Sequence, residues 1–93
     1  MRRSARIDAN QNEIVRHLRK LGFSVAITSG IGKGFPDLVV ANYARTVLVE
    51  LKDGDKPPSD QALTLDETEF HAKWKGNLLV ANKLDDILKY FKH

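Results

Sequence analysis

The chain has 93 residues, 42% of them hydrophobic and 29% charged, with no cysteine and a formal net charge of +3 at pH 7. This length predicts a single domain, residues 1–93, and the lack of cysteine excludes disulfides, thiolate metal sites and cysteine nucleophiles. No apolar run approaches the roughly 20 residues of a membrane span, and the N-terminus lacks the apolar core of a signal peptide, so we expect a cytoplasmic protein without a membrane partner.

The first half of the chain predicts a helix followed by three strands. Asp8 is a suitable N-cap, apolar residues recur at helical spacing and a glycine provides the stop, which predicts a helix over residues 9–21. Residues 23–28 are rich in β-branched side chains and predict a strand, which a glycine-rich loop follows. Two apolar runs, residues 38–41 and 47–49, predict two further strands.

The second half predicts two helices around a short strand. Residues 53–61 contain two prolines and a glycine and predict a mobile connection. Thr64 and Glu67 form a capping-box pattern before a helix that ends at Gly76. Residues 77–81 predict a buried strand, and an amphipathic helix completes the chain. The order, αβββαβ with a further C-terminal helix, indicates an α/β fold in which a small mixed sheet is flanked by helices.

The positive charge is concentrated in the first third of the chain. Residues 1–34 contain seven lysines or arginines and two acidic residues, whereas the remainder contains eight and ten. A basic segment beside an acidic cluster is typical of a protein that holds a polyanion near bound cations. A solvated surface explains the same pattern, so charge alone assigns no function.

The hairpin of the second and third strands brings three charged residues together. The polar break at residues 42–45 supplies the turn. A two-residue loop that pairs residue 42 with 45 and a four-residue loop that pairs residue 41 with 46 give the same register. In that register Asp37 lies directly opposite Glu50, with Cβ atoms about 4.5 to 5.5 Å apart, and Lys52 projects from the same face. The other face is apolar and forms the predicted core: Leu38, Val40, Val47, Val49 and Leu51.

Two carboxylates that face each other across a hairpin repel, so the arrangement favours a cation between them. Hard oxygen ligands select Mg²⁺, Mn²⁺ or Ca²⁺ over zinc, and a small carboxylate set leaves positions for water and phosphate oxygens. Lys52 is close enough to orient or help deprotonate a water, or to stabilise charge on a phosphorane-like transition state. These residues predict a metal-dependent phosphodiester site; solvated salt bridges at strand ends are the alternative.

The motif Pro36-Asp37 followed by Glu50-Leu51-Lys52 resembles the PD-(D/E)xK nuclease superfamily. Within it, the chain is similar to the virus-type replication-repair nuclease (VRR-NUC) domain, a relative of Holliday-junction resolvases. The similarity covers nearly the whole chain and includes a Gly-x-Pro-Asp step and the segment LTLDETEFHAKWKG after E-x-K. It implies a restriction-endonuclease-like core and a Mg²⁺-dependent endodeoxyribonuclease, with Mn²⁺ able to substitute, that leaves 5′-phosphate and 3′-hydroxyl ends.

The resemblance also implies roles for individual residues. Asp37, Glu50 and the backbone carbonyl of Leu51 would bind the metal. Lys52 would be the catalytic lysine, and Glu13 in the first helix would approach the same site directly or through water.

Other residues near the motif have a structural and a functional interpretation. Glu67 stands where many relatives have glutamine, and we expect its capping role to explain it. Phe70 and Trp74 are expected in the core and not on a base-stacking surface. Contacts with DNA are predicted for basic residues, each with solvated surface as its alternative: Lys33, Arg2, Arg3, Arg6 and Lys73.

The leading hypothesis is an endonuclease selective for branched DNA such as four-way (Holliday) junctions, acting as a homodimer that makes paired cuts. Such resolvase-like proteins serve DNA recombination and repair, and the resemblance suggests a phage or mobile-element origin. Two alternatives are a non-catalytic or partner-dependent DNA-binding module and a sequence-specific restriction-type endonuclease. Cleavage of one short duplex motif, irrespective of branching, would favour the latter.

Overall fold

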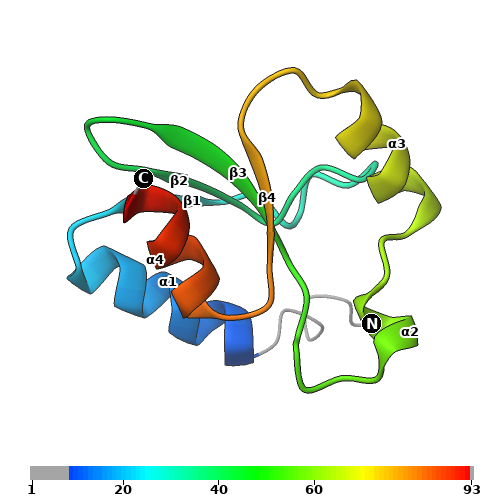
Figure 1. Cartoon of the computed structure of the whole chain (residues 1–93), viewed down its shortest axis with the longest axis horizontal. Helices are drawn as coiled ribbons and strands as arrows, with labels where there is room; N and C mark the ends of the chain where they lie inside the picture. The colour runs from blue at the N-terminus through cyan, green and yellow to red at the C-terminus, as the bar shows by residue number, and fades with distance from the viewer. Residues whose placement is uncertain (1–8, 93) are drawn as a thin grey trace.

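The computed structural model describes residues 9–92, and its elements follow the predicted order with one addition (Figure 1). The elements are α1 (Ala9–Lys20), β1 (Ser24–Ile27), β2 (Leu38–Ala41), β3 (Thr46–Leu51), α2 (Pro58–Gln61), α3 (Leu65–Lys73), β4 (Leu78–Ala81) and α4 (Leu84–Lys92). The addition is α2, a single turn within the connection that the sequence predicts to be mobile. Pro58 starts this turn at a position where the missing N–H is not needed.

The four strands form one mixed sheet in the order β1-β2-β3-β4. β1 pairs with β2, and β2 with β3, in antiparallel orientation, whereas β4 is parallel to β3. In the β2–β3 hairpin Leu38 pairs with Val49 and Ala41 pairs with Thr46, which confirms the predicted register. The Asn42 carboxamide closes the turn by accepting hydrogen bonds from the backbone N–H groups of Ala44 and Arg45.

The core lies between one face of the sheet and the pair α1 and α4. Figure 1 shows both helices on the same side of the sheet, and α4 contributes the fully buried Ile87. Each such aliphatic side chain stabilises the fold by about 1.5 to 3 kcal/mol through burial. The buried sheet and α1 side chains are Ile14, Val15, Leu18, Leu38, Val40, Val47 and Val49. None of the described helices is long and apolar enough to cross a membrane.

Helix α3 lies apart from this core and has no buried residue. The glycine loop before β2 holds it in place, because the Phe35 ring meets the edge of Phe70 at a centroid distance of 5.2 Å. Gly34 packs directly on the first turn of α3. A Cβ atom at Gly34 would lie 2.2 Å from the Asp66 carbonyl oxygen and 2.9 Å from the Glu67 nitrogen.

Gly34→Ala is therefore expected to destabilise the protein by about 2 to 4 kcal/mol, because the new methyl group meets backbone atoms and Gly34 has a φ of 80°. Gly32→Ala is the matched control. Gly32 has a similar φ of 84° but open space around it, so only the conformational cost of about 1 to 2 kcal/mol applies. Urea unfolding of both variants measures the difference. Equal losses would show that the contact with α3 contributes nothing to stability.

Candidate active site

The backbone of the hairpin is interrupted where the charged residues lie. The paired register ends at Leu38 and Val49. The Asp37 N–H donates to the Val49 carbonyl at 3.0 Å, so the ladder does not continue to Pro36, which has no N–H to donate. The Pro36 carbonyl accepts a 2.8 Å hydrogen bond from the Thr28 hydroxyl instead. The Leu51 N–H donates to Asp37 Oδ2 at 2.8 Å. The hydrogen bond from the Leu51 N–H thus fixes the Asp37 carboxylate at the open end of the hairpin.

Lys52 lies between two carboxylates from different elements. Its Nζ is 2.8 Å from Glu67 Oε1 and 3.7 Å from Glu50 Oε2. The side chains are only 12%, 17% and 4% exposed for Lys52, Glu67 and Glu50, respectively, so water screens these charges weakly. Lys52 is therefore held by β3 on one side and by α3 on the other.

Glu67 combines a capping role with a place in the site. Its Oε1 accepts a hydrogen bond from the Thr64 N–H at 2.9 Å, and its own N–H donates to the Thr64 hydroxyl at 3.2 Å, so the predicted capping box is confirmed. The same Oε1 atom accepts from Lys52. The expectation that capping alone explains Glu67 is wrong, because the helix start that it caps is packed against the charged end of β3.

The electrostatics show too much negative charge for one lysine. Burial, then the charges of Asp37 and Glu67, raises the pKa of Glu50 from 4.5 to about 9. Burial also raises the pKa of Asp37 above its ordinary value. Burial opposes the charged form of Lys52, but the hydrogen bond and charge of Glu67 outweigh it and raise the Lys52 pKa. The hydrogen bond from Lys52 likewise overcomes burial and lowers the pKa of Glu67.

These residues line an open pocket of about 600 Å³ and fit a hard cation. Glu50 Oε1 is buried and has no hydrogen-bond partner among residues 9–92. A carboxylate oxygen in that position costs free energy unless a proton or a cation satisfies it. Within the same part of the chain, no group of three or more histidine, cysteine, aspartate or glutamate side chains is arranged around a metal position. The carboxylates of Asp37 and Glu50 with the Leu51 carbonyl form a small donor set, which leaves positions for water and substrate oxygens.

The structure does not bring Glu13 to this pocket. Glu13 lies on the exposed face of α1, where its Oε2 is 3.3 Å from Arg16 Nη2. The buried polar residue of α1 is Gln11, whose Nε2 lies 3.4 Å from the Ser29 hydroxyl. The metal role of Glu13 stays a prediction that rests on the resemblance.

The predicted DNA-binding lysines lie elsewhere on the molecule. Lys33 and Lys73 line a separate pocket together with Trp74, which is 42% exposed, so its assignment to the core is wrong. Helix α3, which ends at the residue before Trp74, has no buried residue and leaves the indole ring partly exposed. Three other predicted contacts, Arg2, Arg3 and Arg6, fall outside the described residues.

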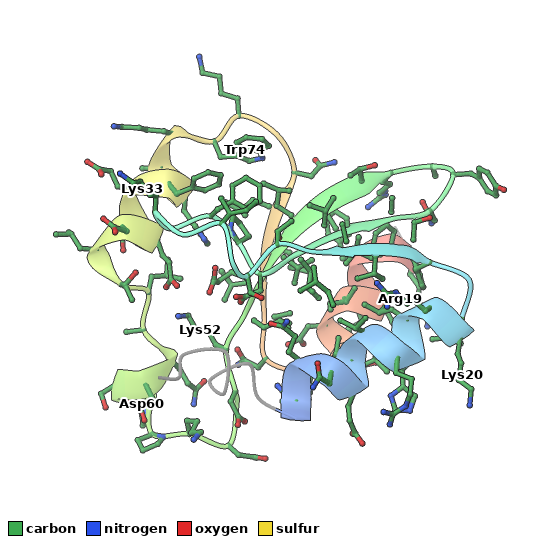
Figure 2. All side chains as sticks on the ribbon, turned by 180° about the vertical axis from the view of Figure 1, so that it is seen from behind. Arg19, Lys20, Lys33, Lys52, Asp60 and Trp74 are labelled. Carbon is green, nitrogen blue, oxygen red and sulfur yellow. The ribbon has the colours of Figure 1, made fainter. Side chains whose placement is uncertain are left out.

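Three further residues line the pocket that sequence reasoning did not select. Asp53, Lys56 and Asp60 reach it from the connection between β3 and α3, on which Figure 2 labels Asp60. Lys56 is exposed and supplies a second amine beside that of Lys52. The only sequence signal is that this connection follows E-x-K directly, which says nothing about the direction in which the chain turns.

Glu67→Ala is expected to lower the free energy of unfolding by about 2 to 3 kcal/mol, because the Thr64 N–H loses its acceptor and Lys52 loses its closest carboxylate. Glu67→Gln keeps an oxygen acceptor and should lose about 1 kcal/mol. Glu69→Ala, which removes an exposed pair with Lys73, should change stability by less than about 0.5 kcal/mol. Denaturant unfolding measures all three. A Glu67→Ala loss as small as that of Glu69→Ala would contradict the double role.

The chain is similar to a solved structure, whereas protein-family models and curated proteins gave no match. Among solved structures, the chain is similar to one described as a VRR_NUC domain, with 30% sequence identity and a TM-score of 0.55. The match covers 89% of this chain and 90% of that structure.

Proposed function

Since the chain belongs to the VRR-NUC family of nuclease domains, we propose that it is a Mg²⁺-dependent endonuclease that hydrolyses phosphodiester bonds in DNA. One observation supports this most directly. Asp37 and Glu50 face each other at the end of the hairpin, Glu50 Oε1 has no partner among the described residues, and Lys52 lies 3.7 Å from the other Glu50 oxygen. A purely structural salt bridge would not leave a buried carboxylate oxygen unsatisfied.

Asp37, Glu50 and the Leu51 carbonyl would hold the metal ion. A hard divalent cation suits this all-oxygen set, so Mg²⁺ is the proposed ion and Mn²⁺ its substitute. When bound, such an ion supplies Lewis-acid polarisation of a phosphate oxygen and lowers the pKa of a water molecule. The protein holds Asp37 for this role through the Leu51 N–H and holds Glu50 between two neighbouring strands.

Lys52 acts on the substrate as a cation. Its pKa is raised by Glu67, so the amine is protonated at neutral pH and is a poor general base. A protonated amine held rigidly beside the scissile phosphate stabilises the negative charge that develops during attack by water. Of the two roles that the sequence leaves open for Lys52, the electrostatic one therefore has the better support.

The preferred substrate is proposed to be branched DNA, cut by a homodimer. The support is the resemblance to dimeric resolvases, together with an exposed apolar position at the sheet edge, because Ile27 of the edge strand β1 is 48% exposed. Two identical sites related by a twofold axis would cut two strands of a four-way junction. Light scattering at micromolar concentration tests the dimer; a monomer throughout would contradict it.

The experiment that tests this function compares an immobile four-way junction with a linear duplex of matched sequence, each with Mg²⁺ or with EDTA. The products are separated on a denaturing gel. Metal-dependent, paired nicks confined to the junction are the expected result. Cleavage of one duplex motif without regard to branching would favour the restriction-type alternative, and salt-sensitive binding without cleavage, even in Mn²⁺, would favour a DNA-binding module.

A further inference from the structure

The second pocket runs along α3, from its first turn to the residue that caps its C-terminal end. Its volume is about 250 Å³, and it is lined by Lys33, Asp66, Glu69, Phe70, Lys73 and Trp74. Figure 2 shows Lys33 and Trp74 at the same end of the molecule, on the α3 side and apart from Lys52. None of these residues lines the pocket that contains Asp37 and Glu50.

The indole ring of Trp74 is held rigidly but remains accessible. It stacks on the Phe70 ring with centroids 5.4 Å apart and an interplanar angle of 18°. Phe70 is supported in turn by the edge contact with Phe35. A Cβ atom at Gly76 would lie 2.9 Å from Trp74 Nε1, so the chain passes close to the indole edge at this glycine. The ring is nevertheless 42% exposed, which leaves apolar π surface open to a ligand.

Two lysines, Lys33 and Lys73, line the pocket together with this ring. Lys33 has a φ of 57°, an uncommon conformation for a residue with a side chain, and it lies between two glycines that also have positive φ. The contact between Gly34 and the first turn of α3 holds this loop against the pocket. Lys73 Nζ lies 3.9 Å from Glu69 Oε2, which is a long distance for an ion pair. The two side chains are 77% and 68% exposed, respectively. Such a pair contributes little, so Lys73 can exchange Glu69 for another anion at small cost.

We propose that this pocket is a nucleotide subsite, in which Trp74 stacks on an unpaired base of the DNA and Lys33 and Lys73 contact the flanking phosphates. The proposal rests on the proposed function, because it takes DNA as the substrate. Exposed aromatic rings with cations nearby bind single-stranded nucleic acid, and here Lys33 and Lys73 share the pocket of Trp74 with Asp66 and Glu69. A second copy of the chain fits less well, because it would bury four charged side chains around the ring.

The position of the subsite defines the class of substrate. Trp74 is the C-cap residue of α3 and follows Glu67 by seven residues, a rise of about 10 Å, and Glu67 contacts Lys52 directly. The stacked base would therefore lie within a few nucleotides of the scissile phosphate. Bases in an intact duplex have both faces covered by their neighbours. The substrate should accordingly contain unpaired nucleotides beside the cut, as in a flap, a splayed arm or a junction with opened arms.

Trp74 is the only tryptophan in the chain, so its fluorescence reports on the subsite directly. In EDTA, a single strand or a duplex with a single-stranded flap is expected to quench the emission saturably, and a blunt duplex of the same length is not. A strand with the same phosphates but abasic positions should quench little. Equal quenching by the abasic strand would overturn stacking, and emission that changes with protein concentration alone would assign the ring to a second copy.

Substitutions give an independent test with a labelled flap substrate. Trp74→Leu is expected to weaken binding about tenfold, whereas Trp74→Phe keeps a ring and most of the affinity. Lys33→Ala and Lys73→Ala should each weaken binding a few-fold and reduce its salt dependence. Tyr43→Ala, at the fully exposed hairpin tip, is the matched aromatic control and should bind as wild type. Wild-type affinity in Trp74→Leu would overturn the proposal.

The two proposals fail in different ways. Quenching by single strands without cleavage of any substrate would remove the nuclease function and keep the subsite. Cleavage of a fully paired junction without quenching would keep the nuclease function and remove the subsite. Lys89→Ala should quench as wild type does, because Lys89 pairs with Asp85 on the exposed face of α4 and does not line this pocket.

Discussion

Lys52→Ala is expected to lower the rate of Mg²⁺-dependent DNA cleavage at least about a hundredfold. The Lys52 amine is the only lysine nitrogen within 4 Å of Glu50 among the described residues, and Glu67 holds it there at 2.8 Å. Alanine leaves the charge of the transition state without this preorganised cation. Affinity for DNA should change by less than about threefold, because Lys52 is one of several positive contacts. Single-turnover cleavage and binding in EDTA measure the two effects separately.

Lys89→Ala is the matched control for this prediction. Lys89 makes an exposed pair with Asp85 on α4 at 3.3 Å, and its loss should change cleavage by less than about twofold. Thermal unfolding of both variants confirms that the fold is intact. Cleavage by Lys52→Ala at the wild-type rate, or a parallel loss of binding and cleavage, would contradict the electrostatic role.

The metal-free protein is expected to lose stability as the pH rises from about 5 to 9, by an amount on the order of 2 to 4 kcal/mol. Glu50 has a pKa raised from 4.5 to about 9, so folding keeps its proton bound, and that contribution is present at low pH and lost as the pH rises through the folded pKa. The raised pKa of Asp37 acts in the same direction. Glu67, with its lowered pKa, acts in the opposite direction but only at more acidic pH. The raised pKa of Lys52 takes effect only at more alkaline pH.

Glu50→Gln should flatten this pH dependence, because the amide cannot ionise. Urea unfolding in EDTA at pH 5, 7 and 9 measures the slope for both proteins. Mg²⁺ should restore stability to the wild type at high pH, where binding the cation replaces the proton, and should leave Glu50→Gln nearly unchanged. A wild-type profile as flat as that of the variant would show that Glu50 ionises freely in the fold.

Local patterns in the sequence predicted the strands, the hairpin and the central charges. Alternation of apolar and charged residues on two strands joined by a short turn allows one register, and the register places Asp37 opposite Glu50 with Lys52 on the same face. The capping box at Thr64 is equally local, since its two hydrogen bonds join residues three apart. These features depend on neighbours in the chain or across one turn, which is why they could be predicted.

Residues brought in by the connection between β3 and α3 could not be predicted in the same way. The sequence assigns Glu67 a sufficient local role, and only the packing of α3 brings its Oε1 to Lys52. The pocket positions of Asp53, Lys56 and Asp60 depend on how that connection folds back over the end of β3. Glu13 is the opposite case. The bounds of its helix were predicted to within one residue, yet its side chain is exposed to solvent beside Arg16 and does not reach the site.

The sequence by itself determined the order of elements, the hairpin register and the pairing of two carboxylates with a lysine. The tertiary structure alone decided that Glu67 completes the surroundings of Lys52, and that Lys33, Lys73 and Trp74 share a pocket. The physical reason is the distance along the sequence over which each kind of interaction acts. Period and turn chemistry act over a few residues, whereas the placement of α3 depends on contacts such as Gly34 on Asp66 and Phe35 on Phe70, between segments about thirty residues apart that have no common periodicity.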